Sequence, residues 1–176
     1  MFIPMMIKHP CNLSQLLKIF TISLILTISC GVGPGYGNDS GADEHCSGPW
    51  YHANLTYYIS YPPPDSEECL EYNGCEWAGY FYGLDEQQTE QWVALHNIVA
   101  VHSKDWEWLG MRILRIRQGS HSILAKVYDL CSDTDCNSCC TQNLGGDNYL
   151  IDMEFHTTKR FGSYEGIVEF QVCDEE

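Results

Sequence analysis

Apolar and polar residues alternate along several short runs in the second half of the chain. Met111 to Arg117 places apolar residues between three arginines, and the alternation resumes after a Gly-Ser turn from Ile123 to Tyr128. Two such runs around a short turn predict a β-hairpin. Tyr149 to Met153 and Gly166 to Val172 are short apolar runs, which predict two further strands.

The first half of the chain has the same character. Ala53 to Tyr61, Trp77 to Leu84 and Asn97 to His102 are rich in aromatic and β-branched residues and are predicted strands. Thr89 to Leu95 and Glu154 to Phe161 are predicted short helices, the second of them ended by a glycine. About six or seven strands with so little helix predict an all-β fold, either a small barrel or a sandwich.

The amino terminus predicts export. Residues 1–31 contain two lysines, no acid, an apolar run and then small residues, which is the pattern of a secretory signal peptide. The run is shorter than the roughly 20 residues of a membrane span. We expect a flexible leader over 32–48 and one folded domain over 49–176, in a secreted, extracellular monomer without a membrane span. Asn38 and Asn54 begin glycosylation sequons if the host is eukaryotic.

The charge of the chain excludes one class of partner. Removal of residues 1–31 takes two of the nine basic residues and none of the 24 acids, so the net charge changes from −15 to −17. A surface of that sign repels phosphate backbones, and we therefore expect no nucleic-acid partner. It also disfavours acidic wall polymers such as pectin.

Eight cysteines remain after the signal segment, and an even number in an exported chain predicts up to four disulfides. The spacing of Cys69 and Cys75 around an Asn-Gly turn suggests a stapled loop. A zinc site is the weaker alternative for the closely spaced cysteines, and a lipid anchor is a weaker alternative for Cys30. The sequence leaves the pairing open among Cys46, Cys69, Cys75, Cys131, Cys136, Cys139, Cys140 and Cys173.

Asp129 is the candidate functional acid. It ends the second arm of the predicted hairpin and is followed at once by four cysteines within residues 131–140. A strand end held by covalent crosslinks keeps a carboxylate in a fixed position, where it can bind a ligand or transfer a proton. The alternative is a crosslinked turn with solvated acids.

Several motifs in a fixed order resemble a known family. They are an opening strand, an Asp-Leu-Cys strand end, an Asp-containing strand, a helix closed by Phe-Gly and a final Gly-Ile-Val strand. This order resembles the double-psi β-barrel of expansins, barwin-like proteins and rare-lipoprotein-A-like domains, over about Tyr51 to Cys173. The matching segments are Ala53 to Tyr58, Val127 to Cys131, Leu150 to Met153, Phe155 to Gly162 and Gly166 to Phe170.

The resemblance implies a six-stranded double-psi β-barrel with short helices that binds cell-wall or other extracellular polysaccharide. By position, Asp129 matches the acid that wall-loosening expansins require, and Thr56 and Tyr58 match polar residues beside it. A half-buried carboxylate near hydroxyls can accept hydrogen bonds from a sugar, or act as a general acid if its pKa is raised. Asp152 is expected to cap the helix that follows it.

Aromatic residues are numerous enough to supply a sugar-stacking surface. Trp77, Trp106 and Trp108 are the tryptophan candidates, and Tyr128 adjoins Asp129. Tyr and Trp rings stack on apolar faces, although such residues more often belong to the core or its rim.

Hydrolysis is the less favoured activity. The family-45 endoglucanases share this barrel and require two carboxylates, but Ser60 stands where their base is expected. Asp65 or Glu67 could approach from the next loop. We therefore expect polysaccharide binding without cleavage, no cofactor and no catalytic metal.

Two other function classes stay open. The first is an acidic extracellular matrix or calcium-associated protein, because Asp133 to Asn137 begins like a calcium loop. Ser138 and Leu144, however, replace the glycine and glutamate that such a loop needs. The second is a secreted effector that uses the stapled loops as a binding surface.

Overall fold

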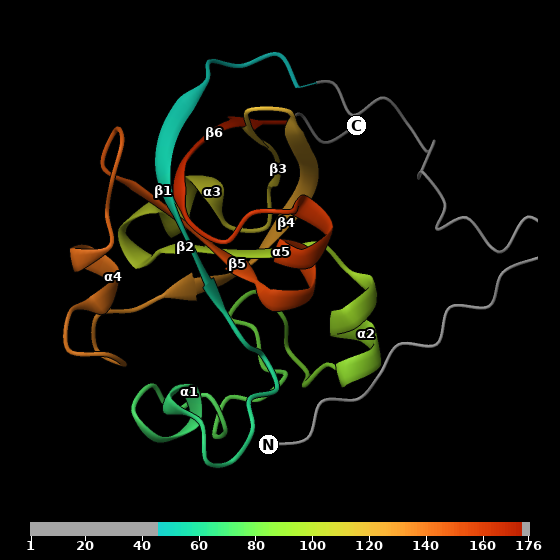
Figure 1. Ribbon diagram of the computed structural model, residues 1–176, viewed down its shortest axis with the longest axis vertical. Helices are drawn as coiled ribbons and strands as arrows, with labels where there is room; N and C mark the ends of the chain where they lie inside the picture. The colour runs from blue at the N-terminus through green and yellow to red at the C-terminus, as the bar shows by residue number, and fades with distance from the viewer. Residues whose placement is uncertain (1–45, 174–176) are drawn as a thin grey trace, which may run out of the picture. The chain divides into compact units, whose positions relative to one another are not determined.

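The computed structural model describes residues 46–173, and six strands close into a barrel in the order β1-β5-β2-β4-β3-β6 (Figure 1). The neighbours β1 and β5, and β2 and β4, run parallel, whereas the other four pairs are antiparallel. The all-β barrel prediction is confirmed, and the double-psi crossing stays a prediction. The strands are β1 Tyr51–Tyr58, β2 Ile98–His102, β3 Ile113–Gln118, β4 His121–Cys131, β5 Tyr149–Glu154 and β6 Gly166–Val172.

Short helices connect the strands. The predicted helix of residues 89–95 is α2, where the Thr89 hydroxyl accepts a hydrogen bond from the Trp92 amide at 3.2 Å. The predicted helix before Gly162 is α5, and Gly162 ends it with a φ of 85°, a backbone conformation that glycine favours. The helices are α1 Glu67–Leu70, α2 Glu90–Leu95, the 3₁₀ helix η1 Ser103–Asp105, α3 Trp106–Leu109, α4 Cys139–Gln142 and α5 Phe155–Phe161.

The predicted strand of residues 77–84 is wrong, because this segment forms consecutive turns. The Tyr80 amide bonds the Trp77 carbonyl at 2.9 Å, and the Leu84 amide bonds the Phe81 carbonyl at 2.9 Å. Phe81 is buried beside α2 instead of lying in a sheet. The aromatic composition that suggested a strand therefore serves packing against a helix.

The buried apolar residues form two clusters, one inside the barrel and one outside it. Ala53, Leu55, Val99, Val101 and the equivalent residues of the other strands fill the barrel interior. Ile98, on the opposite face of β2, packs outside the barrel with Phe81 and Val93. The outer face of β2 is thus covered, and all five of its residues are buried.

All eight cysteines of the described residues form disulfides, as predicted. Two of the four bridges lie side by side in the loop after β4, where the Cys136 and Cys140 sulfurs are 3.7 Å apart. Four disulfides within residues 46–173 are consistent with an extracellular protein. The pairs are Cys46–Cys173, Cys69–Cys75, Cys131–Cys140 and Cys136–Cys139.

Some predictions concern the amino-terminal region. The signal peptide of residues 1–31, most of the leader and Asn38 lie outside the described residues. Within 46–173, no helix has the length and apolar character to cross a membrane. The Asn54 side chain donates a hydrogen bond to the Asn143 carbonyl at 2.9 Å, and glycosylation of Asn54 stays a prediction.

Candidate functional site

Two carboxylates lie in one row across four neighbouring strands. In the barrel register, Thr56 of β1 pairs with Asp152 of β5, and Asp152 pairs with Ala100 of β2. Ala100 in turn pairs with Asp129 of β4. Because Thr56 and Asp152 alternate with interior residues, this row lies on the outer face of the barrel. The two acids therefore flank the small side chain of Ala100.

A β-bulge brings Asp129 into this row. Ala125 and Val127 point into the interior, and strict alternation would send Asp129 there too. The register instead shifts between the pairs Val99–Val127 and Ala100–Asp129, which leaves Tyr128 as the extra residue. The extra residue exchanges the two faces of β4 for the residues that follow it, so Asp129 faces outward beside Ala100.

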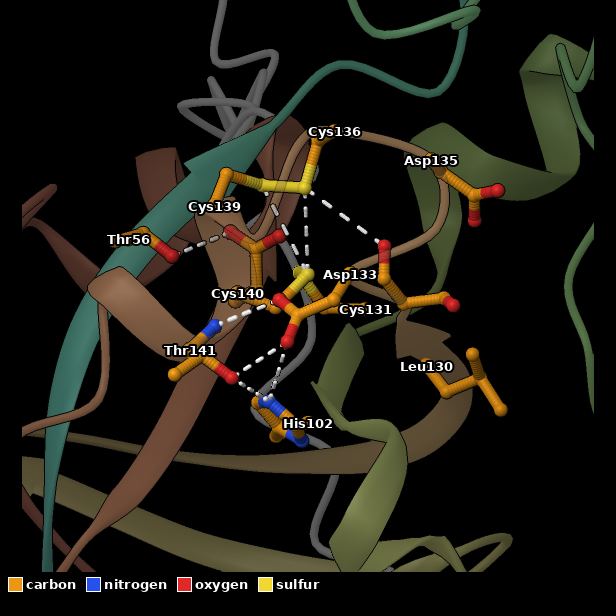
Figure 2. Close-up of a disulfide and its surroundings, with 12 residues drawn as sticks. Thr56, His102, Leu130, Cys131, Asp133, Asp135, Cys136, Cys139, Cys140 and Thr141 are labelled. Carbon is orange, nitrogen blue, oxygen red and sulfur yellow. Dashed lines mark hydrogen bonds and ion pairs between the residues drawn. A yellow bond between two sulfur atoms is a disulfide. The ribbon is translucent and has the colours of Figure 1, made fainter.

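These residues form the floor of a cavity of about 460 Å³. Its walls come from β1, from the α1 loop, from the residues after β4 and from the loop after α5. Asp129, Thr56 and Tyr58, all predicted from the sequence, line this cavity together. Figure 2 shows Thr56 directed toward a neighbouring carboxylate, next to the Cys136–Cys139 disulfide that forms one wall.

Asp129 has a raised pKa. Its Oδ1 accepts hydrogen bonds from the Tyr82 amide at 3.0 Å and the Leu130 amide at 2.9 Å. Burial raises the pKa of Asp129 to about 6, although the two amide bonds oppose this by stabilising the charged form. Asp135 raises the pKa of Asp129 further by repulsion. A carboxyl with this pKa is mostly ionised at neutral pH and can still accept a proton.

Asp152 is the second acid, and its predicted role as a helix cap is wrong. The residue that caps α5 is Glu154, whose carboxylate accepts a hydrogen bond from the His156 amide at 2.6 Å. Asp152 lies two residues earlier, inside β5, where it accepts a hydrogen bond from the Thr56 hydroxyl at 2.6 Å. Burial raises the pKa of Asp152 to about 7, and the nearby Glu68 and Asp129 add to the rise.

Tyr58 adds an unsatisfied hydroxyl to the cavity. The Tyr58 and Ser60 hydroxyls are both buried and neighbour each other, and neither makes a hydrogen bond of ordinary geometry. Burial, with repulsion from Asp129 and Asp152, raises the pKa of Tyr58 well above its usual value, so the phenol stays protonated.

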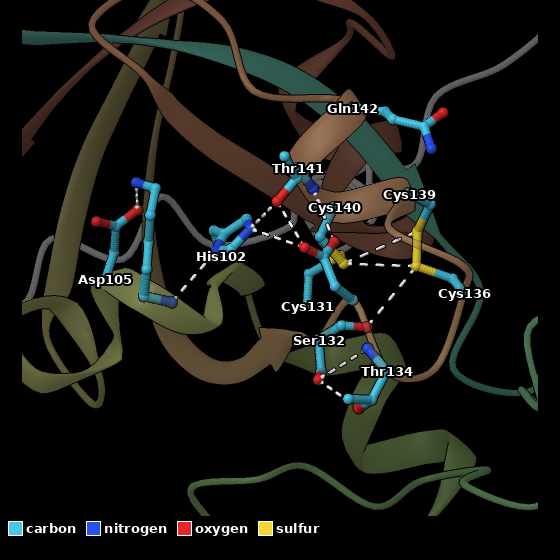
Figure 3. Close-up of polar contacts among 12 residues, drawn as sticks. His102, Asp105, Cys131, Ser132, Thr134, Cys136, Cys139, Cys140, Thr141 and Gln142 are labelled. Atoms are coloured by element: carbon cyan, nitrogen blue, oxygen red, sulfur yellow. Dashed lines mark hydrogen bonds and ion pairs between the residues drawn. A yellow bond between two sulfur atoms is a disulfide. The ribbon is translucent and has the colours of Figure 1, made fainter.

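A polar network holds the wall formed by residues 131–142 (Figure 3). The Lys104 amide donates to Nδ1 of His102 at 3.1 Å, so Nε2 carries the proton and donates to the Thr141 hydroxyl at 3.0 Å. Thr141 in turn donates to the Asp133 carboxylate at 2.5 Å. Because the His102 Nε2–H donates to Thr141, the imidazole cannot take a proton from the Thr141 hydroxyl and does not activate it as a nucleophile. The network instead connects α4 to the end of β2.

The aromatic residues predicted to stack on sugars do not gather at the cavity. Tyr128 packs against Trp92 with ring centroids 5.4 Å apart, and Trp106 packs against Tyr82 at 4.9 Å. Trp108 lines a separate cavity of about 450 Å³. Trp77 is exposed and does not line the cavity of Asp129.

Other aromatic residues surround the cavity. Tyr57, Tyr72 and Tyr164 line it and are exposed by 48%, 39% and 43%. Tyr57 and Tyr164 meet edge to face, with centroids 5.6 Å apart. Strict alternation after Ala53 and Leu55 would place Tyr57 in the interior, so it did not indicate this exposed ring, and no local pattern linked Tyr72 or Tyr164 to this site.

The cysteine loop does not have the features of a metal centre. Within residues 46–173, two groups of potential ligands lie within 4.8 Å, and both contain Cys140. Its sulfur is bonded to Cys131, so it offers no thiolate. Asp133, the first acid of the calcium-like sequence, accepts two hydrogen bonds from Thr141. Those two bonds lower the pKa of Asp133.

No protein-family model matches the sequence, and no curated protein matches it. Among solved structures, an apo expansin from Clavibacter michiganensis is similar with a TM-score of 0.42 and 10% sequence identity. The match covers 73% of this chain and 52% of the expansin, so the chain spans about half the length of that protein. The closed six-stranded barrel is compatible with an expansin-like barrel.

Proposed function

We propose that the protein is secreted and binds an extracellular polysaccharide, such as a cell-wall glycan, in the cavity across β1, β5, β2 and β4. The observation that carries the proposal is the row of Thr56, Asp152 and Asp129 on the floor of an open cavity. Its carboxyl groups can accept hydrogen bonds from sugar hydroxyls, and the tyrosines at the rim offer ring faces. Binding need not lead to cleavage.

Glycoside hydrolysis is a second candidate, and a specific observation favours it. The sequence analysis assigned Asp152 to a helix cap, whereas it lies two strands from Asp129 in the barrel. Two inter-strand spacings put their Cα atoms about 9 to 10 Å apart. Inverting glycosidases hold their carboxyl groups about 6.5 to 9.5 Å apart to leave room for a water, and the small side chain of Ala100 between the two acids leaves such room.

The two acids would then have different roles. Asp152, with a pKa of about 7, holds its proton near neutral pH and would be the general acid. Asp129, with a pKa of about 6 and two amide donors, is more readily ionised and would be the base that activates water. Thr56 would orient the Asp152 carboxyl through its hydrogen bond.

A sedimentation assay on insoluble cellulose, chitin and peptidoglycan tests both candidates. The oxidised protein, an Asp129→Asn variant and an Asp152→Asn variant are compared with Asp85→Asn, an exposed acid that does not line the cavity. We expect binding that both cavity variants weaken and Asp85→Asn does not. Reducing sugars released by the unmodified protein but by neither cavity variant would establish hydrolysis. Failure to bind any polymer would overturn the proposal.

A further inference from the structure

We infer that the glycan accepted by this cavity carries free ammonium groups, as in a polymer of amino sugars without acetyl groups. The inference rests on the proposed function and concerns the substrate class of the same cavity. It starts from the charges on the cavity wall. Five carboxylates line the cavity, and its lining contains no lysine, arginine or histidine. They belong to Glu68, Asp129, Asp135, Asp152 and Glu165.

These carboxylates repel one another in the free protein. Glu68 and Asp129 raise the pKa of Asp152, and Asp135 raises the pKa of Asp129. A neutral sugar would cover the acids without relieving this repulsion, and a uronic acid polymer would increase it. An ammonium group within a few ångströms would relieve it and favour the ionised carboxylates. The electrostatic preference is therefore for a cationic ligand.

The spacing of the acids selects an extended cation over a metal ion. Within the part of the chain from 46 to 173, no three of the cavity carboxylates bring their oxygens within 4.8 Å of one another. Calcium needs six to eight oxygen ligands at about 2.3 to 2.6 Å, which carboxylates so dispersed do not provide. The amino groups of a sugar polymer are spaced along its chain. The cavity acids are likewise spread out, from Asp152 on β5 and Asp129 on β4 to Asp135 and Glu165 at the rim.

A second feature of the wall points to a ligand independently of charge. Tyr58 lines the cavity, and its buried hydroxyl makes no hydrogen bond of ordinary geometry, with the Ser60 hydroxyl as its polar neighbour. A phenol can accept a hydrogen bond from an ammonium group and donate one to a sugar hydroxyl. At the rim, the rings of Tyr57 and Tyr164 can contact either the apolar face of a sugar or a cation.

Calorimetric titration with soluble oligosaccharides tests the inference. Glucosamine oligomers and N-acetylglucosamine oligomers of the same length differ in charge and acetylation, and cello-oligosaccharides are a neutral reference. The pH is kept mildly acidic so that the amines and the rim acids are both charged. Because half-exposed ion pairs each contribute little, we expect the free-amine oligomer to bind about tenfold more tightly than its acetylated counterpart.

Two double variants separate the cavity from the general negative charge of the protein. Asp135→Asn with Glu165→Gln removes two rim acids, and Asp85→Asn with Glu107→Gln removes two exposed acids that do not line the cavity. The first pair should abolish most of the preference and the second should leave it unchanged.

Equal binding of charged and acetylated oligomers would overturn the inference and leave polysaccharide binding intact. An equal loss of preference in both double variants would assign the attraction to net charge and also overturn it. Binding of no oligosaccharide at all would overturn the inference and the proposed function together.

Discussion

Asp152→Asn should stabilise the folded protein above neutral pH. The pKa of Asp152 is raised from 3.8 to about 7, so the folded state holds its proton over a pH range in which the unfolded chain has released it. Stability therefore decreases as the pH rises from about 4 to about 7, and the cost is complete above that range. An asparagine removes the ionisation and can still accept the Thr56 hydrogen bond at its carbonyl oxygen.

The magnitude follows from the size of the shift. About three pH units at 1.36 kcal/mol each correspond to about 4 kcal/mol, and partial exposure of the side chain reduces this to about 2 to 4 kcal/mol. We expect the free energy of unfolding of Asp152→Asn to exceed that of the unmodified protein by this amount at alkaline pH. At pH values below about 4, where the unfolded chain also holds the proton, the protonated acid and the amide should be nearly equivalent.

Urea unfolding followed by tryptophan fluorescence measures this difference when the disulfides are kept intact. The experiment is run below about pH 4 and above about pH 7, with the exposed Asp85→Asn as the reference for an acid outside the cavity. An Asp152→Asn variant that is less stable than the unmodified protein at alkaline pH would refute the reasoning. That result would mean that the folded state stabilises the ionised carboxylate instead of opposing it.

Two further substitutions test the site and the core. Thr56→Val removes the hydrogen bond that lowers the pKa of Asp152, so its titration, followed by carboxyl NMR, should move to higher pH; an unchanged titration would contradict the bond. Phe170→Ala should cost about 3 to 5 kcal/mol in urea unfolding, because the ring is fully buried in the barrel interior; a cost below about 1 kcal/mol would contradict that packing.

The hairpin and the helix ends were predictable because their causes are local. The β3 and β4 strands follow from alternation around a Gly-Ser turn, and Gly162 follows from the conformation needed to end α5. The segment 77–84 was not predictable in this way. Its aromatic residues favour strands by composition, but packing of Phe81 beside α2 outweighs that preference.

The candidate site was predicted in part. Asp129, Thr56 and Tyr58 stood out through their motif positions, and all three line the cavity. Asp152 was assigned to a cap because an acid just before a helix usually has that role, whereas Glu154 occupies the cap. The tryptophans predicted to bind sugar lie outside the cavity of Asp129. The type of a side chain does not indicate which distant residues it contacts in the folded protein.

The sequence by itself determined what depends on neighbours a few residues apart: the strand-rich composition, the turn of the hairpin, the Thr89 cap of α2, the glycine that ends α5, and an even set of cysteines. The tertiary structure decided which distant residues become partners. Strand order places Asp152 and Asp129 on either side of Ala100. The bulge at Tyr128 turns Asp129 outward, since a shift of one residue in a strand exchanges its two faces. Such pairing depends on register between segments far apart in the chain, which no local pattern contains.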